Sequence, residues 1–359
     1  MQALYNDIKQ LWRQKIAFRV ALCYLAGFTL LAVLLPWLPL RYMPNDINLD
    51  KVYAAPCMGG SNSNWFGTDA LGRDVFANTL FGARTAILIS FPVASFTALL
   101  GLVLGTTAGF FGDSGFKTKR VHVIVSVIAA VFLVYLGLYV PIKARVLLPS
   151  NTSLIYYSVA SLILVFVVLW GLARLLWVRF AWFHKPIALP VDQIILRIIE
   201  TLTSVPRLIF ILVLASFLPP TVPMLAILLA LTYWTGIARL ARAEMLKIKN
   251  LPYFESARSI GVTQSAMVFR HALPNMLGPL LISFTFALAS LLTFESTLSF
   301  LGIGIPNTLP SWGRTIAGIR HNAAAWWLLA FPGTFLLATV MALQVTNYYI
   351  LAIIQARKK

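Results

Sequence analysis

The chain has 359 residues, of which 59% are hydrophobic and 11% are charged, and its mean hydropathy is +0.82. This composition excludes an ordinary soluble domain and indicates a protein that lies mostly in a lipid membrane. The net charge of +18 would suit a nucleic-acid-binding protein, but the basic residues lie between apolar runs, and no soluble region remains to form a basic groove. We therefore expect a membrane partner and no nucleic acid.

Eight apolar runs approach or exceed the ~20 helical residues that cross a hydrocarbon core of about 30 Å. They show no strict alternation of polar and apolar residues, which favours helices over barrel strands. The sequence predicts an all-α, polytopic transmembrane helical bundle. The expected spans are residues 17–35, 84–110, 121–140, 154–177, 191–217, 222–245, 276–300 and 326–354.

The amino-terminal region is expected to be a cytoplasmic amphipathic segment, 1–16, followed by an uncleaved anchor, 17–40. This apolar run is long for a signal peptide, and no small-residue cleavage site follows it directly. Lys and Arg cluster in alternate connections, so the positive-inside rule places both termini and the connection at 246–275 in the cytoplasm. Trp326 and Trp327, at the start of the last span, are expected to be interfacial anchors.

An extracytoplasmic loop is expected at 41–83, and it contains the octet GTDALGRD. Its candidate residues are Gly67, Thr68, Asp69, Gly72, Arg73 and Asp74. Read locally, the octet is a capped turn that enters a helix, with Thr68 or Asp69 accepting hydrogen bonds from free amides and Arg73 beside a carboxylate.

The segment YFESARSIGVTQSAMVFRHALPN, 253–275, is polar and lies between two apolar runs. Asn250 is expected to cap a first short helix, Pro252 fits its first turn, and Gly261 can adopt the left-handed conformation that ends it. Thr263 is expected to cap a second helix that runs to Pro274. An ordinary amphipathic connector between two spans is the alternative.

Three motifs carry a resemblance to a known family that covers nearly the whole chain. Glu255, Ala257, Gly261 and the HALP sequence at 271–274 have the spacing of the EAA loop in the membrane subunits of bacterial ATP-binding-cassette (ABC) importers, with Ser256 where alanine is usual. GTDALGRD, and STLSFLGIG at 296–304 followed by PSWGR at 310–314, resemble the permeases of peptide and nickel importers. That type includes the dipeptide and oligopeptide permease C proteins.

The sequence departs from this family in two places. Residues 112–189 carry two additional apolar runs where the family has a short turn, and the carboxyl terminus lacks the usual Gly-Asp ending. A pair of added spans leaves and returns on one side of the membrane, so the orientation of later spans is unchanged. We expect a permease domain at 84–359 with a six-span core and an inserted two-helix hairpin, which suits contact with a partner or with lipid.

The resemblance implies a permease subunit in a bacterial inner membrane that forms half of a path for di- or oligopeptides. It further implies a homologous permease, two ATPase subunits that use ATP and Mg, and an extracytoplasmic solute-binding protein. The chain itself is expected to bind no cofactor and to be no enzyme, since GDSGFKT at 112–118 lacks the Gly-Lys-Ser/Thr of a P-loop. The ATPase-coupling residues implied by the resemblance are Glu255, Ser256, Ala257, Gly261, His271, Leu273 and Pro274.

Charged residues inside spans are costly unless they face a partner or a watery cavity. Arg207, Glu295 and Glu200 are therefore candidates for the translocation path, and an ion pair between Arg207 and Glu295 is the alternative. No His, Cys or carboxylate cluster has metal-ligand spacing. Related systems also transport nickel chelates and other small solutes.

A self-sufficient secondary transporter or channel is the rival function. It would predict inverted repeats and ion-binding carboxylates at mid-membrane, without a docking loop. The sequence shows a docking loop and no internal repeat.

Overall fold

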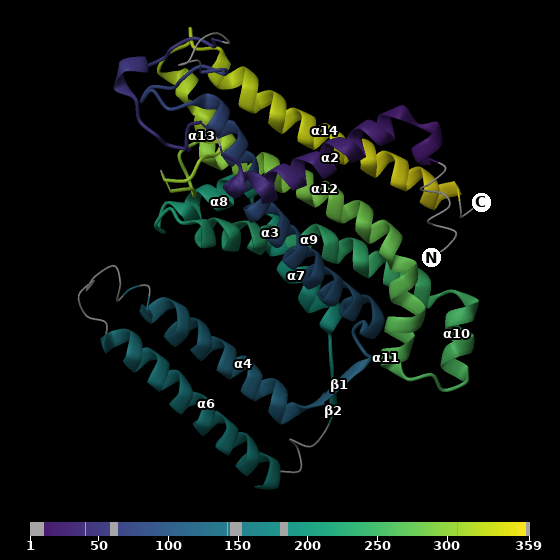
Figure 1. The fold of residues 1–359 in the computed structure, drawn as a ribbon. Helices are drawn as coiled ribbons and strands as arrows, with labels where there is room; N and C mark the ends of the chain where they lie inside the picture. Colours follow the sequence, from purple (N-terminus) through teal and green to yellow (C-terminus); the bar gives the residue numbers. More distant parts are fainter. Residues whose placement is uncertain are drawn as a thin grey trace. The chain divides into compact units, whose positions relative to one another are not determined.

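The computed structural model describes residues 11–39, 41–57, 64–141, 143, 153–179, 186–306 and 308–356. The chain divides into two compact units, residues 1–110 with 195–359, and residues 111–194. Within the described residues, six helices are long and apolar enough to cross a membrane, or seven spans if one bent helix pair counts as a span. The prediction of a polytopic helical bundle is confirmed (Figure 1).

The larger unit contains most of the long helices. α2 is Ile16–Leu34, α3 is Val75–Phe111, α7 is Val191–Thr203, α8 is Arg207–Ala215, α9 is Val222–Lys249, α10 is Pro252–Ser259, α11 is Gln264–Ala266, α12 is Leu273–Phe300, α13 is Trp312–Ala317 and α14 is Trp327–Ala356. α11 continues into α12 through the π-helical segment Met267–Ala272, so that Gln264–Phe300 forms one continuous helix of 37 residues. Short 3₁₀ turns lie at Leu35–Trp37, Leu49–Lys51 and Gly318–Arg320.

α14 packs beside both α2 and α12 (Figure 1). A hydrogen bond of 3.0 Å between the hydroxyls of Tyr24 and Thr339 joins α2 to α14. α12 also packs against α9, where Leu225, Leu229 and Leu291 are fully buried in one apolar cluster. This arrangement makes α12 the central helix between α9 and α14.

α3 and α9 approach at backbone distance along a row of glycines. Gly101, Gly105 and Gly109 recur every fourth residue and therefore share one face of α3. A Cβ atom at Gly105 would lie 2.2 Å from the carbonyl oxygen of Ala238, and one at Gly101 would lie 2.8 Å from that of Trp234. Small residues at such spacing allow close helix packing inside membranes.

The smaller unit is a helical pair on a short β-ribbon. β1, Phe116–Lys119, pairs antiparallel with β2, Pro186–Leu189. α4, Arg120–Val134, continues through the π-helical segment Tyr135–Tyr139 and packs along α6, Ser153–Arg179 (Figure 1). The expected hairpin at 112–189 falls in this unit, and its β-ribbon is a feature that the hydropathy pattern did not predict.

Three expected spans differ from the structure. The run 276–300 is part of the longer helix Gln264–Phe300. The run 191–217 is broken into α7 and α8, which are bent by 77°. The break falls at Pro206, which lacks a backbone N–H and restricts the residue before it. α3 begins at Val75 instead of residue 84, because the Asp74 carboxylate accepts a hydrogen bond of 2.8 Å from the Ala77 amide and caps the helix there.

Candidate functional site

The connection between α9 and α12 begins with the short helix α10. Pro252 lies in its first turn, as predicted, where its missing N–H costs nothing. The residue that caps α10 is Leu251, and Asn250 instead ends α9 with its amide donating to the Lys247 carbonyl. The predicted cap at Asn250 is therefore wrong by one residue, because α9 runs farther than its apolar pattern.

Gly261 ends α10 in the predicted left-handed conformation, with a φ of +81°. The Val262 amide donates to the Ala257 carbonyl at 3.2 Å, and the Gly261 amide donates to the Arg258 carbonyl at 3.1 Å. These two bonds form a complete Schellman motif, which satisfies carbonyls at the end of the helix. The turn after α10 is therefore fixed by local hydrogen bonds.

The second helix of this connection does not end at Pro274. Thr263 precedes α11, but its side chain makes no capping hydrogen bond, and the helix continues through Met267–Ala272 into α12. Pro274 lies in the first turn of α12. A proline is tolerated there because the wider π-helical turn interrupts the regular hydrogen-bond ladder just before it. Near Pro274, where the sequence predicted the end of a helix, the structure changes from a π-helical segment to the α-helix α12.

α10 is held rigidly against the ends of α9 and α12. Phe254 is buried in a cluster with Met245 and Met276, which come from these two helices, and Ala257 is also buried. On the neighbouring face, Asn275 donates to the Tyr253 hydroxyl at 2.9 Å and to the His271 carbonyl at 2.8 Å.

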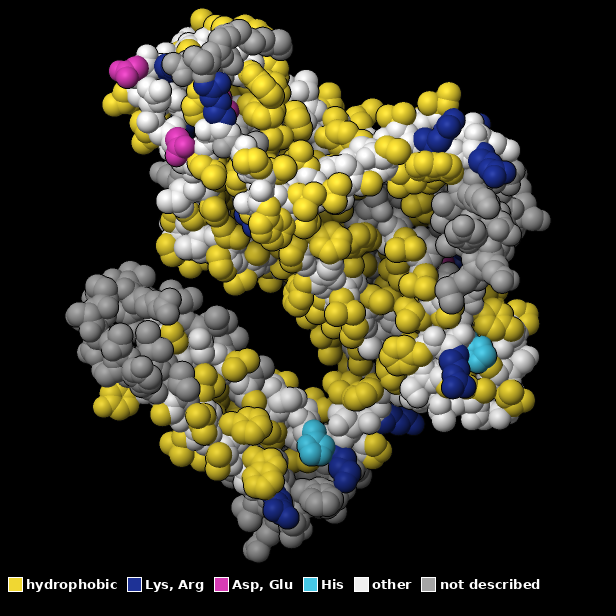
Figure 2. Space-filling view, viewed as in Figure 1, with side chains coloured by type: hydrophobic (Ala, Val, Ile, Leu, Met, Phe, Trp, Pro, Cys, Tyr) yellow, Lys and Arg dark blue, Asp and Glu magenta, His cyan; other side chains and the backbone are white. Residues whose placement is uncertain are grey.

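The exposed face of the connection between α9 and α12 carries both polar and apolar side chains. Glu255, Ser256, Gly261 and Pro274 are exposed, His271 and Leu273 are half-buried, and Ala257 is the motif residue that faces the core. Ile260 and Phe269, which the sequence analysis did not single out, are 81% and 67% exposed. The sequence feature that could have identified Ile260 and Phe269 is the presence of large apolar side chains in an otherwise polar connection. Figure 2 shows hydrophobic, basic and histidine side chains gathered over α10 and α11.

In the octet GTDALGRD, Asp69 organises the turn. One oxygen of its carboxylate accepts from the Leu71 and Arg73 amides at 2.9 and 3.0 Å, and the other accepts from Arg73 Nε at 2.7 Å. Gly72 has a φ of +69°, and a Cβ there would lie 1.7 Å from the Asn48 carbonyl oxygen. These residues therefore form a close-packed turn.

The same octet fixes the start of α3. Asp74 accepts from Asn64 Nδ2 at 2.7 Å, in addition to its capping bond. Thr68 donates to the Lys51 carbonyl and accepts from the Ala54 amide at 2.8 Å, and Gly67 has a φ of +75°. The local interpretation of a capped turn holds, with Asp74 in place of Thr68 or Asp69 as the helix cap.

Two tryptophan side chains join α3 and the octet to later segments of the chain. Trp312 of PSWGR is fully buried and donates from Nε1 to the Thr79 carbonyl on α3 at 2.8 Å. Trp327 is also buried and donates to the Thr68 carbonyl at 3.0 Å, so it is a core residue and not the expected interfacial anchor. The pKa of Arg314 lies below its usual value, because burial and the neighbouring Arg73 lower it by more than Glu295 raises it.

Glu295 lies inside α12 and is 1% exposed. Its carboxylate accepts from the hydroxyls of Ser299 at 3.0 Å, Ser311 at 2.9 Å and Ser296 at 3.2 Å. Ser311 directly precedes α13, so this carboxylate joins α12 to the PSWGR segment. Its surroundings are those of a structural polar centre.

Arg207 and Glu200 lie apart from this centre and have other partners. The Arg207 guanidinium lies 4.0 Å from the centroid of the Tyr233 ring, which is a cation–π distance. Glu200 forms an exposed ion pair with Arg197, with 3.1 Å between Oε2 and Nη1. Within the described residues, the suggested ion pair between Arg207 and Glu295 is not formed, because each side chain is engaged elsewhere.

The long apolar helices, the broken α7–α8 pair and the rigid α10 connection define a multi-pass helical membrane protein. Residues 188–358 match the family described as "Binding-protein-dependent transport system inner membrane component".

Curated relatives extend the similarity over almost the whole chain. A putative peptide transport system permease protein of Brucella suis biovar 1 is 26% identical over 338 residues, covering 94% of this chain and 86% of the relative. The oligopeptide transport system permease protein OppC of Bacillus subtilis is 26% identical over 347 residues, covering 96% of this chain and 87% of the relative. The resemblance seen in the motifs, which is to permease subunits of ABC importers, is confirmed.

Proposed function

We propose that this permease forms one half of the translocation path of a bacterial inner-membrane peptide importer, with both termini in the cytoplasm. Its relatives carry the names of peptide and oligopeptide transport permeases. A homologous permease would supply the other half, a solute-binding protein would deliver peptide from outside, and two ATPase subunits would use ATP and Mg.

The observation that carries the proposal is the rigid attachment of α10. Phe254 packs in one cluster with Met245 of α9 and Met276 of α12, so a force on α10 is passed to both helices. Glu255, Ile260 and Phe269 remain exposed, which gives an ATPase surface an acidic and an apolar contact. Small displacements of such a packed element become movements of whole helices.

Gly261→Pro is expected to abolish co-purification of ATPase subunits with the tagged chain from its native membrane. Proline requires a φ near −65°, and the native φ of +81° is beyond its reach. Glu255→Arg should have the same effect by reversing an exposed contact charge. Mass-spectrometric identification of the co-purified subunits measures both results.

Two matched variants control this experiment. Gly261→Asn keeps a residue that tolerates the left-handed conformation, and Asp50→Arg reverses another exposed acid in the outer loop. Both should retain the ATPases. Retention in Gly261→Pro and Glu255→Arg would contradict the coupling role, and a wild-type chain without ATPases would favour the stand-alone transporter.

Arg207 is the charged residue that we place in the path, beside Tyr233. A partly exposed guanidinium near the break between α7 and α8 suits the carboxylate of a peptide. Arg207→Gln should lower peptide uptake by roughly tenfold, because one charge-assisted hydrogen bond is lost, while the complex assembles normally. Radiolabelled peptide uptake in membrane vesicles measures this, with Arg197→Gln as the exposed control. Unchanged uptake in Arg207→Gln would remove this residue from the path.

A further inference from the structure

The sequence around α2 is basic and almost without acids. Residues 1–45 contain one acid, Asp7. Their basic residues are Lys9, Arg13, Lys15, Arg19 and Arg41. α14, which packs beside α2, lies in the stretch 296–359, and that stretch contains no Asp or Glu. α2 and α14 therefore supply no counter-charge for the basic side chains at the start of α2.

Arg19, one turn into α2, has a buried guanidinium nitrogen. Its Nε is buried and has no hydrogen-bond partner among the described residues. The neighbouring Phe18 contacts Tyr349 edge to face, with 5.6 Å between the ring centroids, so this part of α2 lies against α14. A buried charged donor without an acceptor is costly, and native structures seldom leave one. The geometry indicates an acceptor that reaches Arg19 from outside the chain.

Lys15 lies one turn before Arg19 and adds a second donor. Its carbonyl accepts from the Arg19 amide at 3.2 Å, and its side chain is exposed. Neither side chain forms an ion pair within the part of the chain that the structure describes. Both lie near the positive end of the α2 dipole, and the first turn of α2 contains no acid. An anion bound here would be stabilised by all three positive charges.

An open apolar face continues along α2 from these donors. Ile16 and Val20 are 70% and 62% exposed, and Leu30 is exposed farther along. A Cβ at Gly27 would meet nothing within 4 Å, so the helix surface is also open between Val20 and Leu30. Figure 2 shows basic side chains beside hydrophobic ones where α2 begins. A charged end joined to an apolar face matches the polarity of a phospholipid.

We propose that the start of α2 binds one anionic phospholipid. Arg19 Nε and the Lys15 ammonium donate to its phosphate, and an acyl chain lies along Ile16 and Val20. Anionic lipids gather around basic residues next to a membrane-spanning helix. The membrane thereby supplies the counter-charge that α2 and α14 lack. A free phosphate ion could meet the same two donors but would leave the apolar face uncovered.

Lipid competition on the full chain tests the proposal. The chain is purified in mild detergent with any subunits that accompany it, and is incubated with equal amounts of phosphatidylglycerol and phosphatidylcholine that have identical acyl chains. Native mass spectrometry should show preferential retention of one phosphatidylglycerol. Lys15→Gln combined with Arg19→Gln should weaken this retention by roughly 30-fold, because each basic residue near an anionic headgroup contributes about fivefold.

Two results of this competition overturn the proposal. One is a preference for phosphatidylglycerol that survives in the double variant. The other is displacement of the lipid by an equal concentration of glycerol phosphate, because that result shows a small-anion site that does not use the apolar face.

Ile16→Glu tests the missing counter-charge directly. A glutamate at 16 lies three residues before Arg19, where it can form an ion pair with it, and an acid is favoured in the first turn of a helix. This variant should lose the preference for phosphatidylglycerol although both donors are still present. Its thermal unfolding in lipid-free detergent should occur at or above the wild-type temperature. Retention of the lipid preference in Ile16→Glu would contradict the site.

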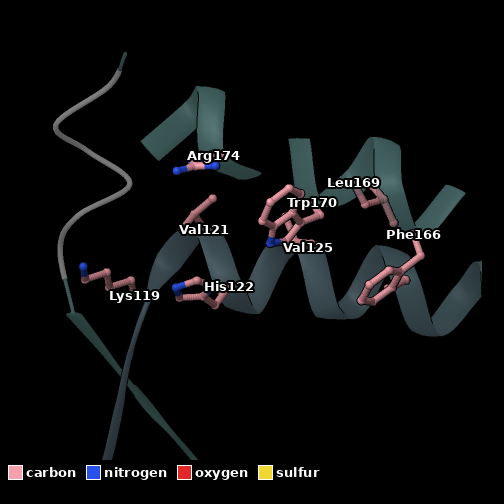
Figure 3. A pocket seen from close by; sticks show the side chains of 9 residues that line it. Lys119, Val121, His122, Val125, Phe166, Leu169, Trp170 and Arg174 are labelled. Atoms are coloured by element: carbon pink, nitrogen blue, oxygen red, sulfur yellow. The ribbon is translucent and has the colours of Figure 1, made fainter. Parts of the chain in front are cut away.

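Two matched variants separate this site from general charge attraction. Arg41→Gln removes an arginine beyond the other end of α2, where it lies 5.5 Å from the centroid of the Tyr42 ring. Arg174→Gln removes an arginine of α6 in the smaller unit, which lies 5.6 Å from the centroid of the Trp170 ring (Figure 3). Both variants should keep the preference. An equal loss in either one would show attraction to overall charge and would overturn the site at α2.

A protein occupant is the other outcome. A photo-crosslinking amino acid in place of the exposed Val20, activated in native membranes, should label phospholipid. Labelling of another membrane protein would show that a partner covers this face of α2, and would overturn the lipid site.

Discussion

Glu295→Leu is expected to destabilise the protein by about 3 kcal/mol, whereas Glu295→Gln should change its stability little. Leucine removes the acceptor of three serine hydroxyls, and a buried hydroxyl left unpaired costs about 1–3 kcal/mol. Ser296 and Ser299 can turn back to carbonyls of their own helix, so most of the loss falls on Ser311, which lies outside α12. Glutamine keeps a carbonyl oxygen that can accept from Ser311.

Thermal unfolding of the purified chain in detergent measures this difference. Thr293→Val, an exposed hydroxyl on the same helix, is the control and should stay close to wild type. Ser311→Ala should remove part of the same stability, and the two changes should combine with less than additive effect because they break one interaction. A Leu variant as stable as wild type would contradict the structural role.

Transport by Glu295→Gln separates structure from pathway. The carboxylate is buried and fully engaged by serines, so we expect the assembled variant to transport peptide at nearly the wild-type rate. Loss of transport in a stable, assembled Gln variant would return Glu295 to the translocation path.

Gly105→Ala is expected to destabilise the pairing of α3 with α9 by about 1–3 kcal/mol. The new methyl group would lie 2.2 Å from the Ala238 carbonyl oxygen, a backbone atom that cannot rotate away. The two helices must separate to accept it, and packing contacts are what hold helices together in a membrane. Gly105→Leu should prevent stable folding altogether.

Gly236→Ala provides the matched control on α9, because a Cβ there would meet nothing within 4 Å. It should be neutral or slightly stabilising, since alanine favours a helix over glycine. Unfolding titrations of the two alanine variants in mixed detergent compare them directly. If Gly105→Ala were as stable as Gly236→Ala, the close approach of the α3 and α9 backbones at Gly105 would be contradicted.

The pairing of α3 with α9 also brings α3 into contact with α10. Lys249, at the end of α9, donates to the Phe110 carbonyl at the end of α3 with a distance of 2.9 Å. Phe110 in turn contacts Phe254 of α10 edge to face. α10 therefore contacts α3 as well as α9 and α12, and α3 extends to the capped turn at Asp74.

Several features followed from the sequence because their causes are local. Apolar length and the absence of alternation determined the spanning helices, since a chain in lipid must satisfy its backbone within each helix. The end of α10 at Gly261 followed from one residue that adopts a positive φ without strain. The order of the motifs likewise predicted the class of importer, and the comparisons bear this out.

Other features depended on residues far apart in the chain. Hydropathy placed Glu295 inside a span but did not show that Ser311, just before α13, donates a hydrogen bond to it. Trp327 looked like an interfacial anchor until the fold brought the Thr68 carbonyl to its indole N–H. Nothing in the sequence singled out three glycines in an apolar run, Gly101, Gly105 and Gly109. The structure shows that they allow the backbone of α9 to approach α3 closely.

The sequence by itself thus determined the membrane class, most of the helices and the turn at Gly261, which arise from hydropathy and single-residue backbone preferences. Only the tertiary structure decided which buried polar groups are paired, which helices touch through their backbones, and that Ile260 and Phe269 stay exposed while Phe254 is buried. The physical reason is that each of these outcomes depends on a surface supplied by a distant segment, and hydrophobicity along the chain records how apolar a residue is but not what covers it.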